Sequence, residues 1–74
     1  MTTLRLKNTA DGIYEDDFNG FAVMSGRYER LASNDNWVAF DMNTNQFIEK
    51  ATKEEALASL NRRTQADMDV TYTL

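Results

Sequence analysis

Residues 37–60, WVAFDMNTNQFIEKATKEEALASL, predict a hairpin followed by a capped helix, and the rest of the chain is expected to pack around them. Thr52 and Glu55 have the spacing of a capping box, in which the threonine hydroxyl accepts a hydrogen bond from the N–H three residues on. Behind this cap, apolar residues up to Leu60 recur on one side of the helical wheel. We therefore expect a helix over residues 53–63.

The first half of this stretch predicts two strands. Val38, Phe40 and Met42 alternate with other residues, which is the two-residue period of a strand that buries one face. The segment Asn43 to Asn45 then supplies a turn, because asparagine tolerates the left-handed conformation that short hairpin loops require. The chain is expected to return along a second strand over residues 46–50.

Two amphipathic strands are expected near the ends of the chain, over residues 3–7 and 68–73. In both segments apolar residues alternate with polar ones, which is typical of a strand with one buried face. The segment 8–12 ends in Asp11-Gly12, a dipeptide that is common in turns, so the chain is expected to reverse or to leave the sheet there.

Residues 16–32 fit two interpretations. On a helical wheel, most of the apolar residues in this segment share about half of the circumference. Against a helix stand Gly20 and Gly26, each of which costs about 1 kcal/mol relative to Ala in a helix interior, and Asn19-Gly20 is also a typical hairpin turn. We favour the helix because hydrophobic periodicity is the main signal of secondary structure, and we keep a pair of strands as the alternative.

The favoured order of elements is strand, helix, strand, strand, helix, strand, which is the ferredoxin-like arrangement. It predicts an α+β fold in which a small antiparallel sheet carries two helices on one face and leaves its other face wet. The alternative for residues 16–32 gives a β-meander with one helix instead. In both cases residues 1–74 form a single domain, because the chain is too short for two cores.

Composition excludes most kinds of catalytic site. The chain has no Cys and no His, which removes disulfides, zinc sites with Cys ligands, and nucleophilic catalysis that depends on a histidine base. The paired carboxylates Asp16 with Asp17, and Asp67 with Asp69, lack the spacing of a calcium-binding loop. We therefore expect no enzymatic activity, no cofactor and no metal site.

The charge and hydropathy pattern bears on the location and the partners of the chain. No apolar run approaches the roughly 18 residues of a membrane span, and the N-terminal stretch lacks the apolar core of a secretory signal. We expect a cytoplasmic protein without a membrane partner. The net charge of −4 argues against general attraction to nucleic acids.

A partner surface is expected where acidic and aromatic residues have no evident structural role. The acidic residues ahead of Phe18 would steer and orient a basic partner, such as a nucleic-acid-binding protein or complex whose charged groove they would occupy. Two aromatic residues would serve as anchors. The residues expected to bind the partner are Asp11, Glu15, Asp16, Asp17, Tyr28 and Trp37.

The leading functional hypothesis is a small acidic protein-binding module that acts stoichiometrically on a larger partner. Size and charge suit a phage or bacterial inhibitor, such as an anti-CRISPR or other anti-defence protein. One alternative is a nucleic-acid-binding regulator that uses the open sheet face, where Trp37 would join Arg5 and Lys7. The other is a self-associating structural or accessory subunit whose exposed sheet edge pairs with a copy of itself.

Overall fold

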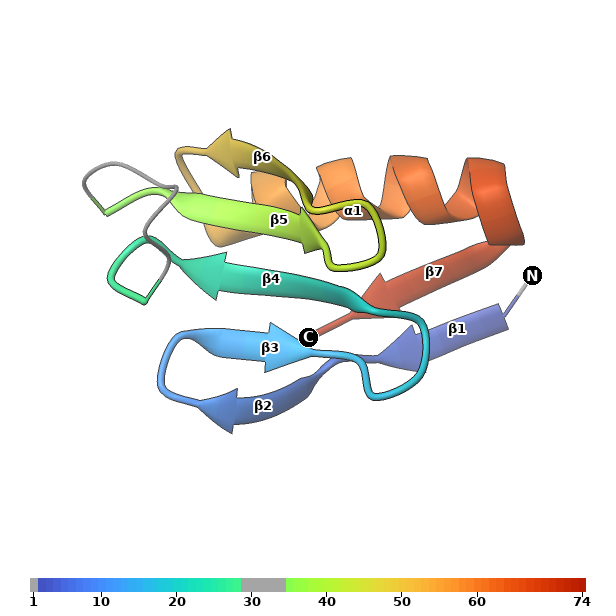
Figure 1. Cartoon of the computed structure of the whole chain (residues 1–74), viewed down its shortest axis with the longest axis horizontal. Coiled ribbons are helices and arrows are strands. Elements are labelled where there is room, and N and C mark those ends of the chain that lie inside the picture. Colours follow the sequence, from blue (N-terminus) through green and yellow to red (C-terminus); the bar gives the residue numbers. More distant parts are fainter. Residues whose placement is uncertain (1, 29–34) are drawn as a thin grey trace.

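The main sheet of the protein is an antiparallel meander of five strands in the order β2-β3-β4-β5-β6 (Figure 1). The computed structural model describes residues 2–28 and 35–74, and within them the fold is α+β with one helix. The elements are β1 (Thr2–Arg5), β2 (Lys7–Ala10), β3 (Ile13–Glu15), β4 (Phe21–Ser25), β5 (Trp37–Asp41), β6 (Gln46–Lys50), α1 (Lys53–Met68) and β7 (Val70–Thr73).

A second sheet of two strands lies beside the meander. Its strands, β1 and β7, run parallel, and the chain passes from β1 into β2 through the single residue Leu6. The Leu6 N–H donates to the Thr73 carbonyl at 2.9 Å, and the Leu6 side chain is buried in the core. Leu6 therefore joins the two sheets, and the strand expected over residues 3–7 is divided at this point.

The helix α1 covers one face of the meander and begins where the sequence predicts. It packs against β4, β5, β6 and β7 (Figure 1). Thr52 is its N-cap, and the Thr52 hydroxyl accepts a hydrogen bond from the Glu55 N–H at 3.2 Å. The predicted capping interaction on the threonine side is confirmed.

The same helix continues beyond the expected end at residue 63 to Met68, and Asp69 then adopts the left-handed conformation with φ 55°. The final turns carry no clear apolar stripe in the sequence. They are held instead by Thr64, which is buried and donates a hydrogen bond from its hydroxyl to the Val70 carbonyl at 2.8 Å. This tertiary contact is not visible in a pattern of apolar residues.

The helix predicted over residues 16–32 is wrong in its described part, because residues 21–25 form the central strand β4. Phe21 and Val23 lie in the core beneath α1, while Ala22 is fully buried on the opposite face of the sheet. A strand that is apolar on both faces loses its alternation and resembles a helical pattern. Residues 29–32 of the predicted helix lie outside the described residues.

A β-meander with one helix, the alternative interpretation, fits the described residues, and the two-helix ferredoxin-like order does not. The hairpin turn considered at Asn19-Gly20 is present between β3 and β4. Gly20 has φ +80°, a backbone conformation that side chains other than glycine rarely adopt. A Cβ at this position would also come within 2.8 Å of the Asn43 side chain.

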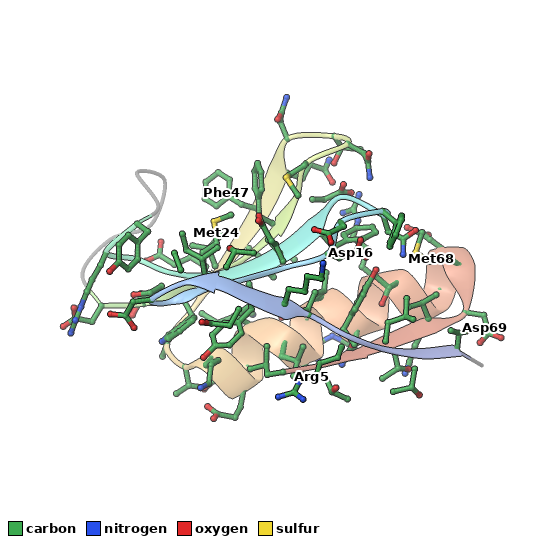
Figure 2. The ribbon with its side chains drawn as sticks, turned by 90° about the horizontal axis from the view of Figure 1, so that it is seen from below. Arg5, Asp16, Met24, Phe47, Met68 and Asp69 are labelled. Carbon is green, nitrogen blue, oxygen red and sulfur yellow. The ribbon has the colours of Figure 1, made fainter. Side chains whose placement is uncertain are left out.

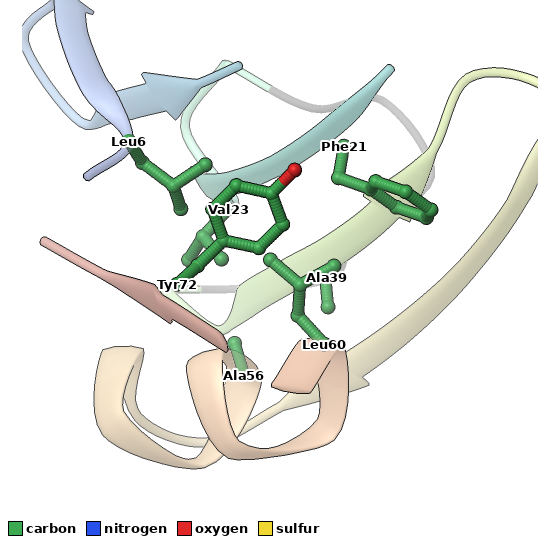
Figure 3. Packing of buried hydrophobic residues seen from close by; sticks show 7 residues of the cluster. All are labelled: Leu6, Phe21, Val23, Ala39, Ala56, Leu60 and Tyr72. Atoms are coloured by element: carbon green, nitrogen blue, oxygen red, sulfur yellow. The ribbon is translucent and has the colours of Figure 1, made fainter. Parts of the chain in front are cut away.

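The core fills the space between α1, the meander and β7 (Figure 3). Tyr72 of β7 lies at its centre, with its ring centroid 6.3 Å from that of Phe21. Seven buried residues form this cluster: Leu6, Phe21, Val23, Ala39, Ala56, Leu60 and Tyr72.

The side chains of β5 that face α1 are not the ones that the sequence predicts. Ala39 belongs to the core beneath α1. Because side chains alternate along a strand, Val38 and Phe40 point to the other face, on which no helix of the described part of the chain packs. The larger apolar residues of this strand are therefore on the helix-free side of the sheet, where a wet face was expected.

Candidate binding surfaces

The helix-free face of the meander is apolar rather than wet. Cross-strand pairing places Ile13, Met24 and Val38 in one row, and Ala22, Phe40 and Phe47 in the next. Ala22 and Val38 are fully buried, whereas Phe47 is 39% exposed. We call the surface made by Ile13, Met24, Phe40 and Phe47 the open face; Figure 2 shows Met24 and Phe47 on the side of the sheet opposite α1.

Charged residues border the open face without occupying its centre. Lys7 of the edge strand β2 pairs across the strands with Glu15 of β3. On the other edge strand, β6, Glu49 pairs with Val38 and accepts a hydrogen bond from the Asn36 side chain at 2.7 Å. The open face is thus an apolar surface with a mixed charged rim.

A second distinctive feature is the loop of residues 16–20 between β3 and β4, which we call the Phe18 loop. The Asp16 carboxylate accepts hydrogen bonds from the backbone N–H of Phe18 at 2.5 Å and from that of Asn19 at 2.6 Å. Its other oxygen accepts a hydrogen bond from the Tyr72 hydroxyl, and that hydroxyl accepts one from the Asn19 side chain at 2.8 Å. The Asp16 carboxylate therefore holds the backbone of the Phe18 loop and also links this loop to Tyr72 in the core.

The Phe18 loop is also attached to the turn between β5 and β6. The Met42 N–H donates to the Gly20 carbonyl at 2.7 Å, and the Asn43 side-chain amide donates to the Asn19 carbonyl at 2.6 Å. Asn43 is itself held by its N–H, which donates to the Asp41 carboxylate at 3.0 Å. Two neighbouring loops thus brace each other at one end of the sheet.

Phe18 is 94% exposed at the surface of this braced loop. The residue before it, Asp17, forms an ion pair with Lys7 of β2. A shallow cavity of about 130 Å³ lies beside the phenyl ring, and its apolar lining includes Leu4 and Tyr72. The loop therefore presents an aromatic ring that the chain itself does not bury.

The hydrogen bonds at Asp16 change the acidity of both partners. Burial alone would raise the pKa of the Asp16 carboxyl, but the hydrogen bonds from Tyr72, Asn19 and Phe18 hold that pKa below its usual value. Burial of the phenol, with the hydrogen bond to Asp16, raises the pKa of Tyr72 to about 12. The carboxylate and the neutral phenol are therefore the stable forms of this pair at neutral pH.

At the opposite end of β3, aromatic and charged residues line a cavity of about 410 Å³. The Tyr14 and Trp37 ring centroids are 6.3 Å apart, and the Lys53 ammonium lies 5.5 Å from the first and 5.6 Å from the second. Asp11 and Tyr28 line the same cavity. This arrangement brings three of the expected partner-binding residues together: Asp11, Tyr28 and Trp37.

The other three expected residues lie at the Phe18 end of β3, so the structure divides the expected surface into two. Glu15 borders the open face, Asp17 pairs with Lys7, and Asp16 has an internal structural role. The two exposed phenylalanines, Phe18 and Phe47, were not among the expected residues. Phe18 would have been noticed if the hairpin at Asn19-Gly20 had been preferred, since an apolar residue in a turn has no core to face.

The base-stacking platform considered for nucleic acids is not assembled. Trp37 pairs with Ser25 and packs against the core on the α1 side of the sheet, whereas Lys7 lies beside Glu15 at the rim of the open face. Trp37 and Lys7 therefore do not share a face. Arg5, the third residue of that platform, lies in β1 of the two-stranded sheet.

Within residues 2–28 and 35–74, no group of three or more acidic side chains is placed to hold a metal ion. In the same part of the chain, no helix is long and apolar enough to cross a membrane. No protein-family model matches this chain, and no curated protein or solved structure matches it either.

Proposed function

We propose that this chain is a protein-binding module that acts stoichiometrically on a larger partner, with Phe18 as its anchor. The observation that carries this proposal is the 94% exposure of a phenylalanine on a loop held by hydrogen bonds on both sides. Burying a phenylalanine side chain contributes about 1.5–3 kcal/mol, and this chain gains none of it from Phe18. A partner pocket would recover that free energy.

The bracing of the loop favours binding for a second reason. Ordering a free loop costs about 1–2 kcal/mol per residue, and a partner of a flexible loop would have to offset this loss. Here the Asp16 carboxylate and the Asn43 amide already hold the backbone around Phe18. Association would therefore lose little conformational entropy in the loop.

The surroundings of Phe18 indicate the chemistry of the partner. Its pocket would be apolar and large enough for a phenyl ring, because truncation-sensitive anchors lie in desolvated pockets. Basic groups around that pocket would suit Glu15 and the net charge of −4 on this chain. An inhibitor that occupies a site on a nucleic-acid-binding protein, in a phage or bacterial setting, would have these properties.

The first test replaces Phe18 with the photoreactive analogue p-benzoylphenylalanine and irradiates the full chain in an extract of its source organism. The same analogue at Thr44, in the neighbouring exposed turn, is the matched control. We expect one protein adduct from position 18 that excess unlabelled wild-type chain suppresses and that Phe18→Ala chain does not. Equal suppression by both chains would contradict the anchor role.

The second test measures affinity for the purified adduct partner by calorimetry. Phe18→Ala should weaken binding about tenfold or more, because anchor residues contribute roughly 2 kcal/mol or more, while Phe18→Tyr should retain most of it. The thermal stability of Phe18→Ala should match wild type, because an exposed side chain contributes little to folding. Unchanged affinity in Phe18→Ala would refute the proposal.

A further inference from the structure

We infer that Asn19-Gly20 is a site of spontaneous deamidation, and that conversion of Asn19 to an acid releases the Phe18 loop. In this reaction the backbone nitrogen of Gly20 attacks the side-chain carbonyl carbon of Asn19. The new bond closes a cyclic imide, the bond to the side-chain nitrogen breaks, and ammonia leaves with the proton that the Gly20 nitrogen gives up. Water then opens the imide and leaves aspartate or isoaspartate at position 19.

Gly20 favours this reaction because nothing on it hinders the attack. Glycine has no side chain to shield its backbone nitrogen. Within residues 2–28 and 35–74, the Gly20 N–H is not tied to a hydrogen-bond acceptor. The turn also requires glycine here, because φ is +80° and a Cβ would come within 2.8 Å of the Asn43 side chain. The fold therefore keeps the reactive dipeptide in place.

The Asn19 side chain is held when the chain is folded. It is half-buried, and its amide nitrogen donates to the Tyr72 hydroxyl at 2.8 Å. An amide held in this way turns less freely towards the Gly20 nitrogen, and the reaction requires the two groups to come into contact. Folding therefore slows the deamidation, and the Tyr72 hydroxyl is one of the groups that slow it.

Deamidation removes a hydrogen bond that the Tyr72 hydroxyl accepts. The phenol has a single proton, which it donates to the Asp16 carboxylate. The hydrogen bond to Asn19 depends on the amide as its donor. A carboxylate at position 19 only accepts hydrogen bonds, and it would lie close to the like charge of Asp16. The link between position 19 and the core is therefore lost.

Isoaspartate also removes the second attachment of the loop. The Asn19 carbonyl accepts a hydrogen bond from the Asn43 side-chain amide at 2.6 Å. In isoaspartate the main chain runs through the side-chain carbons, and this carbonyl becomes part of a free carboxylate. The backbone around Phe18 is then no longer held from both sides, so a partner would have to order it on binding. Only this last step rests on the proposed function.

The first experiment follows deamidation of the full chain at mildly alkaline pH by mass spectrometry of its proteolytic peptides. Asn45, exposed in the neighbouring turn and followed by Gln46, is the internal control. Conversion should be several-fold faster at Asn19 than at Asn45, and faster still at Asn19 in urea. Folded Tyr72→Phe should convert Asn19 faster than wild type. Equal rates at Asn19 and Asn45, or an equal Asn19 rate with and without urea, would overturn the inference.

The second experiment measures hydrogen exchange of the Phe18 N–H by NMR. Asn19→Asp reproduces one product of the reaction, and Asn45→Asp adds the same charge to the neighbouring turn. Exchange at Phe18 should be several-fold faster in Asn19→Asp than in Asn45→Asp or wild type, because the loop opens more often. The Leu60 N–H in α1 should exchange alike in all three chains. Equal exchange at Phe18 in the three chains would overturn the release of the loop.

These two experiments need no partner, so they are separate from the test of the Phe18 anchor. With the purified adduct partner, Asn19→Asp should bind several-fold more weakly than Asn45→Asp. Equal affinities, with faster exchange at Phe18, would overturn control of the partner site by Asn19. Failure of the proposed function gives a different result, which is unchanged affinity in Phe18→Ala.

Discussion

The two faces of the meander are both apolar, but among the described residues a helix packs on only one of them. On the α1 side, Val23 and Ala39 are buried against Leu60 and Tyr72. On the other side, Met24, Phe40 and Phe47 form a surface of similar chemistry, and no helix of residues 2–28 and 35–74 lies on it. The difference shows that an alternating pattern identifies an apolar face without identifying what covers it.

The largest expected effect separates the two faces by stability. Leu60→Ala should lower the free energy of unfolding by about 2–5 kcal/mol, because it opens a cavity in the closed core. Phe47→Ala should lower it by less than about 1 kcal/mol, since water already reaches this ring. Urea unfolding measures both, and equal losses would contradict the distinction between the faces.

A smaller effect is expected at a charge on the covered face. The Asp41 carboxylate, nearly buried, lies 3.0 Å from the guanidinium of Arg63, which is about one-third exposed. Asp41→Asn should cost about 1–2 kcal/mol, because the loss of a charged hydrogen bond is partly screened by solvent.

The matched control for Asp41→Asn is an ion pair in solvent. Asp35 lies 3.8 Å from Arg27, and both side chains are largely exposed. Asp35→Asn should change the free energy of unfolding by about 0–1 kcal/mol at most. If chemical denaturation gives the two substitutions the same cost, burial on the α1 side does not strengthen the Asp41 interaction.

The smallest effect is a pH dependence at Tyr72, beneath the Phe18 loop. Folding raises the pKa of Tyr72 to about 12 from its usual 10.0, so its contribution to stability is complete below pH 10 and is lost as the pH rises through 12. Phenolate absorbance of wild type minus that of Tyr72→Phe should show a step near pH 12. A step at the ordinary value would contradict the buried hydrogen bond to Asp16.

Local signals in the sequence were sufficient for some elements. The turn after β5 and the Thr52 cap involve residues close together in the chain, and both are present as predicted. The end of α1 was missed because Thr64 is held by Val70, across the turn into β7. Hydrophobic periodicity carries no information on such a contact.

The misassignment of residues 16–28 has a different cause. Phe21, Ala22 and Val23 are consecutive and all buried, and β4, the central strand, has β3 and β5 at its two edges. A continuous apolar run of this length does not distinguish a buried strand from a helix. Gly20, with its positive φ, was the better guide.

The candidate site was predictable only in part. Asp11, Tyr28 and Trp37 line one cavity, although nothing in their spacing along the chain indicates this. Asp16 was expected to meet a partner and instead holds the Phe18 loop through Tyr72, which is distant in sequence. The sequence shows that a carboxylate is present, but only the fold shows what it binds.

The most direct test of the central claim, that the α1 side of the meander is closed to solvent and the open face is not, is methyl NMR with a soluble paramagnetic probe. The Met24 methyl should be accessible to the probe, while the Leu60 methyl groups, which are 3% exposed, should be shielded from it. Met24 and Leu60 methyl groups that respond alike to the probe would contradict the claim.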